Sequence, residues 1–99
     1  MKVFISQPMK GKTDEEILEV RNQTIKTVNQ MFKDEEVEII DSFFEGAPVD
    51  AKPLWFLGKS LELLSTADLA VFVPGWNEMR GCKIEHTCAV EYGIKLIEL

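Results

Sequence analysis

Residues 69–73, LAVFV, form an unbroken apolar run, and no other feature of the sequence limits the fold as strongly. A strand with one solvated face alternates apolar and polar side chains, whereas a strand covered on both faces is apolar throughout. Pro74 and Gly75 follow at once and end the run. The sequence therefore predicts a central strand with helices packed above and below it, which is typical of a parallel α/β sheet.

Strand-like runs and helical patterns alternate along the rest of the chain. Further strands are expected at 2–6, 37–40 and 94–99. A first helix should begin after Thr13, which forms a capping box with Glu16, a second at Pro53, and a third covers 81–93. The apolar face of the second helix carries Leu54, Leu57, Leu61 and Leu64. This order predicts one α/β domain over residues 1–99, with a four-stranded parallel sheet, right-handed crossovers and helices on both faces.

Charge and composition exclude several classes of protein. The net charge of −6 argues against a protein that binds nucleic acid polymers, which would need a basic patch. No apolar run approaches the roughly 18 residues of a membrane span, and the first residues lack a signal-peptide core. Cys82 and Cys88 lie too far apart along one helix for a disulfide, and nothing nearby completes a metal site. We therefore expect buried thiols in a cytoplasmic protein with no metal and no membrane partner.

The candidate ligand site follows from the expected fold. In open α/β sheets ligands bind beyond the carboxyl ends of the strands, where the loops 7–12, 41–47 and 74–80 should meet. The loop after the first strand has neither the dinucleotide-binding nor the P-loop pattern, so no cofactor is expected. The candidate substrate-binding residues of this edge are Gln7, Pro8, Met9, Asp41, Gly75, Trp76, Met79, Arg80 and Gly81.

Glu85 lies in the middle of an apolar helix face. At the helical step of about 100° per residue, its neighbours on that face are Gly81, Cys82, Ile84, Cys88, Ala89 and Tyr92. A carboxylate that faces the sheet needs partners, since burying an unpaired charge is costly. Glu85 is either a structural acid that accepts backbone hydrogen bonds or reaches the rim, or a carboxylate at the floor of a pocket. His86 falls on the opposite side, where we expect solvent or a subunit contact.

Arg21 and Trp76 each allow two interpretations. Arg21 is in line with Ile17, Ile25 and Val28, so it either covers the core from the rim or reaches a ligand's phosphate or carboxylate. Trp76 follows a strand end, where its ring could stack on a nucleobase or serve an interface or lid.

Three segments of the chain are similar to a known family: FISQP (4–8), SLELLSTADLAVFVPGW (60–76) and GCKIEHTCAVEYGIKL (81–96). Together they resemble the nucleoside 2-deoxyribosyltransferases, and still more closely a small related family found in bacteria and phages. The hallmark of that family resembles PGW followed by G-x-x-x-E-H-x-x-A-x-x-x-G, which this chain matches from Pro74 to Gly93. The resemblance covers nearly the whole chain and implies a flavodoxin-like three-layer sandwich.

The resemblance implies an activity for Glu85. In the transferases the matching glutamate attacks the anomeric carbon of a 2′-deoxynucleoside, expels the base and passes the sugar to a second base. In related deoxynucleoside 5′-monophosphate N-hydrolases the acceptor is water, and the logic is that of retaining glycosidases. Arg21 and Arg80 would favour a phosphorylated substrate. Because these relatives assemble, and because so small a sheet covers itself poorly, we expect a homo-oligomer.

The chain also departs from the transferases. It has Met79 and Ser60 where they carry acids, and Phe4 where they carry a tyrosine. Ser60 could position a water or a hydroxyl group, so it is kept as a second catalytic candidate beside Glu85. Two alternatives stay open: a non-catalytic nucleotide-binding module on the same scaffold, and a protein-binding role. The aromatic residues that could serve the protein-binding role are Phe43, Phe44, Trp55 and Trp76.

Overall fold

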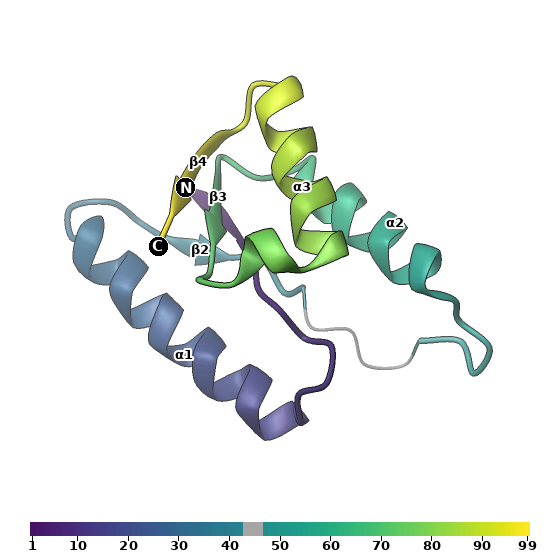
Figure 1. Ribbon diagram of the computed structural model, residues 1–99. Coiled ribbons are helices and arrows are strands. Elements are labelled where there is room, and N and C mark those ends of the chain that lie inside the picture. Colours follow the sequence, from purple (N-terminus) through teal and green to yellow (C-terminus); the bar gives the residue numbers. More distant parts are fainter. Residues whose placement is uncertain (43–46) are drawn as a thin grey trace.

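The computed structural model describes residues 1–42 and 47–99, and these residues form a flavodoxin-like three-layer sandwich (Figure 1). The elements in chain order are β1 (Lys2–Ser6), α1 (Asp14–Met31), β2 (Glu38–Ile39), α2 (Pro53–Leu64), β3 (Leu69–Phe72), the 3₁₀ turn η1 (Trp76–Glu78), α3 (Arg80–Glu91) and β4 (Lys95–Glu98). The four strands pair in parallel in the order β2-β1-β3-β4. The predicted fold class is confirmed.

The order in which the chain adds strands to the sheet reverses between β1 and β3, although the two strands are parallel. From β1 the chain moves to β2 at one edge, and then crosses back to β3 on the other side of β1. The register pairs Val3 with Leu69 and Ser6 with Phe72, so β1 and β3 end side by side. The loops that follow these two strands therefore start next to each other, which is where open α/β sheets bind ligands.

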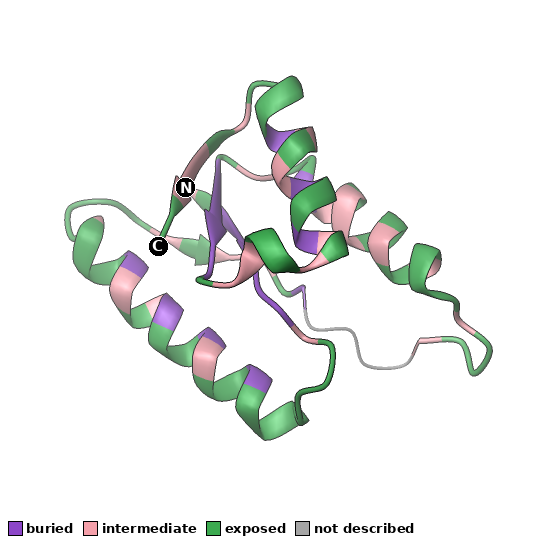
Figure 2. Cartoon of the chain, viewed as in Figure 1, coloured by how far each residue is buried: buried purple, intermediate pink, exposed green. Residues whose placement is uncertain are grey.

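Both faces of the sheet are covered, as the apolar run of β3 predicts. Side chains alternate between the faces along a strand, and Figure 2 shows the buried positions concentrated in β1, β3 and the inner helix faces. The core against α1 consists of Val3, Ile5, Val28, Leu69, Val71 and Val73. The core against α2 and α3 consists of Phe4, Leu64, Ala70, Phe72 and Ala89.

Local signals mark the helix ends as predicted. The Thr13 hydroxyl accepts a hydrogen bond from the Glu16 backbone at 3.2 Å, and the Glu16 carboxylate accepts one from the Thr13 backbone at 3.0 Å. Helix α2 begins at Pro53. After α3, Gly93 has a φ of 71°, a left-handed conformation that favours glycine.

The edge strands are shorter than predicted. Strand β2 has two residues instead of the four expected at 37–40, and β4 covers Lys95–Glu98 instead of 94–99. Each of these strands has a single neighbour in the sheet. The backbone of Ile40 still donates to the Val3 carbonyl at 2.9 Å, so the chain stays beside β1 after regular pairing ends.

The apolar helix faces are narrower than their periodicity suggests. In α2, Leu64 is buried but Leu54 is 77% exposed, because the amino-terminal half of the helix runs past the sheet (Figure 1). In α3, the sheet-facing residues are centred on Glu85, whereas Ile84 and Tyr92 are exposed. The predicted inner faces of both helices are therefore only partly correct.

Candidate functional site

Glu85 is buried at the carboxyl edge of the sheet and is bound by a hydroxyl of the neighbouring strand. Its exposed fraction is 7%, and the Ser6 hydroxyl donates to its Oε1 at 2.8 Å. Ser6 is the last residue of β1 and points, like Phe4 two residues before it, toward α2 and α3. Strand alternation and the helix period together bring these two residues into contact.

The surroundings of Glu85 are polar. Burial raises the pKa of Glu85, and hydrogen bonding from the hydroxyls of Ser6 and Ser60 lowers it, with burial dominant. Within residues 1–42 and 47–99 Glu85 forms no ion pair. Glu85 therefore holds its proton more tightly than an ordinary glutamate, although two hydroxyls are placed to stabilise its ionised form.

Cys82 extends this cluster by one helical turn. It is 5% exposed and is a free cysteine. Burial raises the pKa of the Cys82 thiol, and the nearby Glu85 carboxylate raises it further, although a hydrogen bond with Ser6 lowers it. The thiol therefore stays neutral beside Glu85, and Ser6, Ser60, Cys82 and Glu85 form a compact group contributed by β1, α2 and α3.

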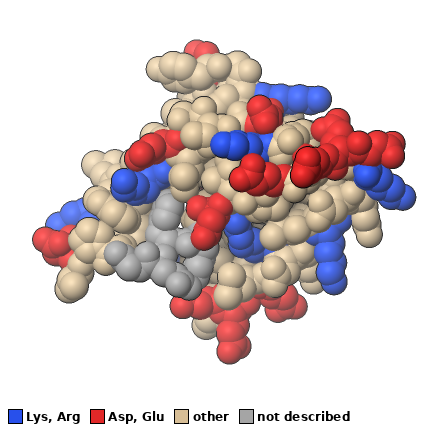
Figure 3. Space-filling view, turned by 180° about the vertical axis from the view of Figure 1, so that it is seen from behind, with Lys and Arg blue, Asp and Glu red and all other residues tan. Residues whose placement is uncertain are grey.

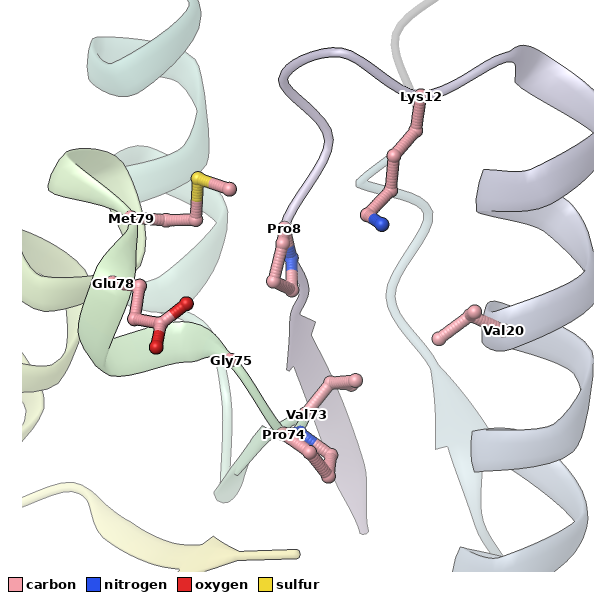
Figure 4. Close-up of a pocket in the computed structure, with 8 residues that line it drawn as sticks. All are labelled: Pro8, Lys12, Val20, Val73, Pro74, Gly75, Glu78 and Met79. Atoms are coloured by element: carbon pink, nitrogen blue, oxygen red, sulfur yellow. The ribbon is translucent and has the colours of Figure 1, made fainter.

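A separate cavity of about 200 Å³ lies between the loops that follow β1 and β3. We call it the switch-point cavity. Its lining residues are Pro8, Lys12, Val20, Val73, Pro74, Gly75, Glu78 and Met79. In Figure 4, Pro8 lies between Lys12 and Val20 on one side and Glu78 and Met79 on the other. The cavity occupies the place that the strand order predicts for a ligand.

Gly75 shapes this cavity through its backbone. Its φ of 94° lies in the left-handed region, and a Cβ placed there would lie 3.4 Å from the Cγ of Pro8. Glycine therefore allows the chain to turn after β3 while it stays close to the loop after β1.

The switch-point cavity reaches from α1 to the connection that precedes α3. Val73 belongs to the core against α1 and Val20 to α1 itself, whereas Ser6 and Glu85 face the α2 and α3 layer. Of the predicted binding residues, the cavity brings together Pro8, Gly75 and Met79; Glu85 does not line it. Residues 43–46 of the predicted loop 41–47, which include Phe43 and Phe44, lie outside the described residues.

Two polar lining residues were not among the candidates. Lys12 ends the loop after β1, and Glu78 ends η1. Lys12 follows Gly11, whose φ of 79° marks a turn. A lysine after a glycine in the loop after the first strand could have drawn attention to Lys12. No comparable signal in the sequence indicated Glu78.

Gln7 is buried on the α1 side of the same edge. Its exposed fraction is 5%, and its Nε2 donates to the Ile17 carbonyl at 3.0 Å. Its Oε1 is buried and has no hydrogen-bond partner among the described residues. Met9, two residues on, is half-buried, and its carbonyl accepts a hydrogen bond from the Lys12 backbone at 3.1 Å.

The guanidinium of Arg21 joins α1 to the end of β2. Its Nη2 donates to the Ile40 carbonyl at 2.8 Å, and its Nη1 donates to the Ser42 hydroxyl at 3.2 Å. Burial lowers the pKa of Arg21, and the charge of Asp41 opposes this. Arg21 is therefore buried and bonded to groups of the protein itself, in line with its structural interpretation, and contact with a ligand stays a prediction.

Trp76 and His86 lie against each other instead of projecting from the molecule. Their ring centroids are 4.0 Å apart at an interplanar angle of 8°. The expected outer position of His86 holds only in part: its side chain is 20% exposed and its Nε2 lies 2.7 Å from Glu98 Oε2, and a subunit contact stays a prediction. The cause is tertiary, because β4 and Phe72 supply partners that helix periodicity cannot reveal.

Arg80 is exposed and Gly81 half-buried in the first turn of α3.

The described residues offer no site for a metal ion and no membrane-spanning element. They contain no group of three or more His, Cys, Asp or Glu residues that could hold a metal. None of their helices has the length and apolar character needed to cross a membrane. Figure 3 shows basic and acidic side chains interspersed over the face that is hidden in Figure 1.

Comparisons of the chain with protein-family models, with curated proteins and with solved structures gave no match.

Proposed function

We propose that this protein cleaves or transfers the N-glycosidic bond of a 2′-deoxynucleoside or of its 5′-monophosphate, with Glu85 as the nucleophile. The observation that carries the proposal is the buried Glu85 carboxylate, which accepts a hydrogen bond from Ser6 at the carboxyl edge of the sheet. The resemblance of 81–96 to the deoxyribosyltransferases assigns the nucleophile to this same position. Burial of a carboxylate without a cation is costly, which supports a role beyond packing.

The proposed reaction is a double displacement. A carboxylate oxygen of Glu85 forms a bond to the anomeric carbon while the N-glycosidic bond breaks, and the bonding electrons leave with the base, which takes up a proton. The resulting glycosyl ester is then attacked by water, or by a second base, and Glu85 is released as a carboxylate. Hydrogen bonds from Ser6 and Ser60 would orient Glu85 and favour its ionised form.

The departing base needs a proton donor, and the structure offers Glu78 for this role. Ser60 is near Glu85 but a hydroxyl is a poor acid, and Met79 cannot donate a proton. Glu78, next to Met79, has a carboxyl group and lines the switch-point cavity. A substrate that reaches from the cavity to Glu85 could take its proton from Glu78, which would make this side chain the general acid.

The second candidate is a non-catalytic nucleotide-binding module. Its support is that Glu85 does not line the switch-point cavity and that the positions of both matching acids hold Met79 and Ser60. On this alternative, a nucleotide would occupy the cavity near Lys12, and Glu85 would be a buried structural acid. In both cases the partner is a small molecule, the protein is cytoplasmic, and no nucleic acid polymer is bound.

Self-association is part of the proposal. Exposed apolar side chains lie on α2 and α3, among them Leu54, Val90 and Tyr92. Burying such side chains between copies would remove apolar surface from water. The third possibility, recognition of another protein, would use the aromatic residues Phe43, Phe44, Trp55 and Trp76.

The proposal is tested by incubating the protein with each 2′-deoxynucleoside and each 5′-monophosphate, with and without a second free base, and separating the products by chromatography. We expect wild type to release free base and Glu85→Gln to lose at least about 100-fold in rate. Glu91→Gln, which changes an exposed glutamate of the same helix, is the matched control and should behave as wild type.

Three outcomes are informative. A new nucleoside in the presence of a second base identifies a transferase, and free base alone identifies a hydrolase. No turnover by wild type, combined with a nucleotide-dependent rise in melting temperature, would overturn the enzyme and establish the binding module.

A further inference from the structure

Four side chains from four elements meet on the α3 face near β4. Trp76 comes from η1, His86 from α3, Glu98 from β4 and Phe72 from β3. The rings of Trp76 and His86 are stacked, and Phe72 meets both by its edge, with centroids 5.6 Å from Trp76 and 4.9 Å from His86. The proposed reaction uses none of these contacts.

The imidazole of His86 is held in two directions. Trp76 covers its face, and the Glu98 carboxylate lies 2.7 Å from its Nε2. Glu98 is half exposed, so this polar contact is screened and contributes modestly by itself. Its geometric effect is that the ring cannot turn away from Trp76 without losing the contact with β4.

Trp76 belongs to the segment from β3 to α3 that lines the switch-point cavity. Gly75 and Glu78 flank it in the sequence, and both line the cavity, as does Met79. Three backbone hydrogen bonds fold this turn: Trp76 to Val73 at 3.1 Å, Glu78 to Gly75 at 3.1 Å, and Met79 to Trp76 at 3.2 Å. A single 3₁₀ turn with no side-chain cap has little stability of its own, so its position depends on where the indole is anchored.

We propose that His86 is a positioning residue, which acts through Trp76 to hold the connection from β3 to α3 and thereby sets the affinity of the switch-point cavity for its ligand. Glu98 fixes His86 in this role. The part of the inference that concerns a nucleotide ligand rests on the proposed function; the part that concerns the position of the connection does not.

The first experiment uses the protein alone. Hydrogen exchange of the Glu78 and Met79 amides is compared in wild type, His86→Leu, Glu98→Gln and the control Thr87→Leu, an exposed change on the same helix. Emission of Trp76 is followed in a Trp55→Phe background. We expect faster exchange and greater quenching by acrylamide in His86→Leu, a smaller effect of the same sign in Glu98→Gln, and no effect of Thr87→Leu. His86→Phe, which keeps a flat ring over Trp76, should restore most of the protection.

The second experiment adds each 2′-deoxynucleoside and each 5′-monophosphate and measures Kd and turnover. His86→Leu should weaken binding about tenfold and raise KM while kcat stays near the wild-type value, unlike Glu85→Gln, which should lose kcat and keep Kd. If His86→Leu matches Thr87→Leu in exchange and emission, the positioning role is overturned. If it differs but wild type binds neither the nucleosides nor the monophosphates, the positioning role stands and the proposed function falls. If nucleotides bind wild type and His86→Leu equally, the control of affinity by His86 is refuted.

Discussion

The carboxylate of Glu85 couples the site to the stability of the fold. Its pKa is raised by burial above the value of the unfolded chain, so the folded state binds the proton more tightly. As the pH rises between the unfolded and the folded pKa, the unfolded chain loses its proton first and the folded state loses stability. Above the folded pKa the whole penalty is present.

We therefore predict that Glu85→Gln is more stable than wild type at neutral pH, by on the order of 1 kcal/mol. The amide keeps an acceptor for Ser6 and carries no charge. The difference should shrink as the pH falls through the interval between the two pKa values, which denaturant unfolding at a series of pH values would measure. Glu91→Gln should follow wild type throughout; a Glu85→Gln variant less stable than wild type at neutral pH would contradict the prediction.

At the scale of single residues, the sequence predicted which side chains are buried better than it predicted which side chains touch each other. The helical period placed Glu85 on the inner face, and it is buried there. The same period put His86 outside, because it describes one helix and not the β4 strand or the indole that cover that side. Lys12 and Glu78 were missed for a related reason, since cavity lining depends on how two loops approach each other.

At the scale of elements, helix starts follow from local chemistry. The capping box of Thr13 and Glu16 and the proline at the start of α2 are short-range signals, and both are present as predicted. Edge strands depend on a single neighbour, so their length cannot be read from an apolar run alone.

The cap of α1 gives a prediction at this scale. Thr13→Ala removes the acceptor for the Glu16 backbone amide and should lower the free energy of unfolding by about 1 kcal/mol. Urea unfolding followed by circular dichroism would measure it. Thr87→Ala, an exposed change inside α3, is the control, and it should cost less than Thr13→Ala; equal effects would mean that the cap is not needed.

For the whole molecule, the exposed apolar side chains bear on assembly. Leu54 of α2 is 77% exposed, and Leu18 of α1, which packs on the other face of the sheet, is 41% exposed. An apolar patch that is buried between copies tolerates a charge poorly, because that charge would lose its water.

We predict that Leu54→Glu shifts the protein toward the monomer by at least about tenfold in the dissociation constant. Light scattering coupled to size-exclusion chromatography over a range of concentrations would measure the shift. Leu18→Glu serves as the control and should leave the assembly unchanged. A wild-type protein that is monomeric at every concentration would refute self-association.

The central position of β1 has a consequence for how the chain is made. Strand β1 is synthesised well before its partner β3: the Lys2 backbone donates to Asp68 Oδ2, just before β3, at 2.8 Å across 66 positions. Until β3 has been synthesised, one edge and much of one face of β1 have nothing to pair with. Such exposed edges favour aggregation, so this protein should depend most on chaperones between the synthesis of β1 and that of β3.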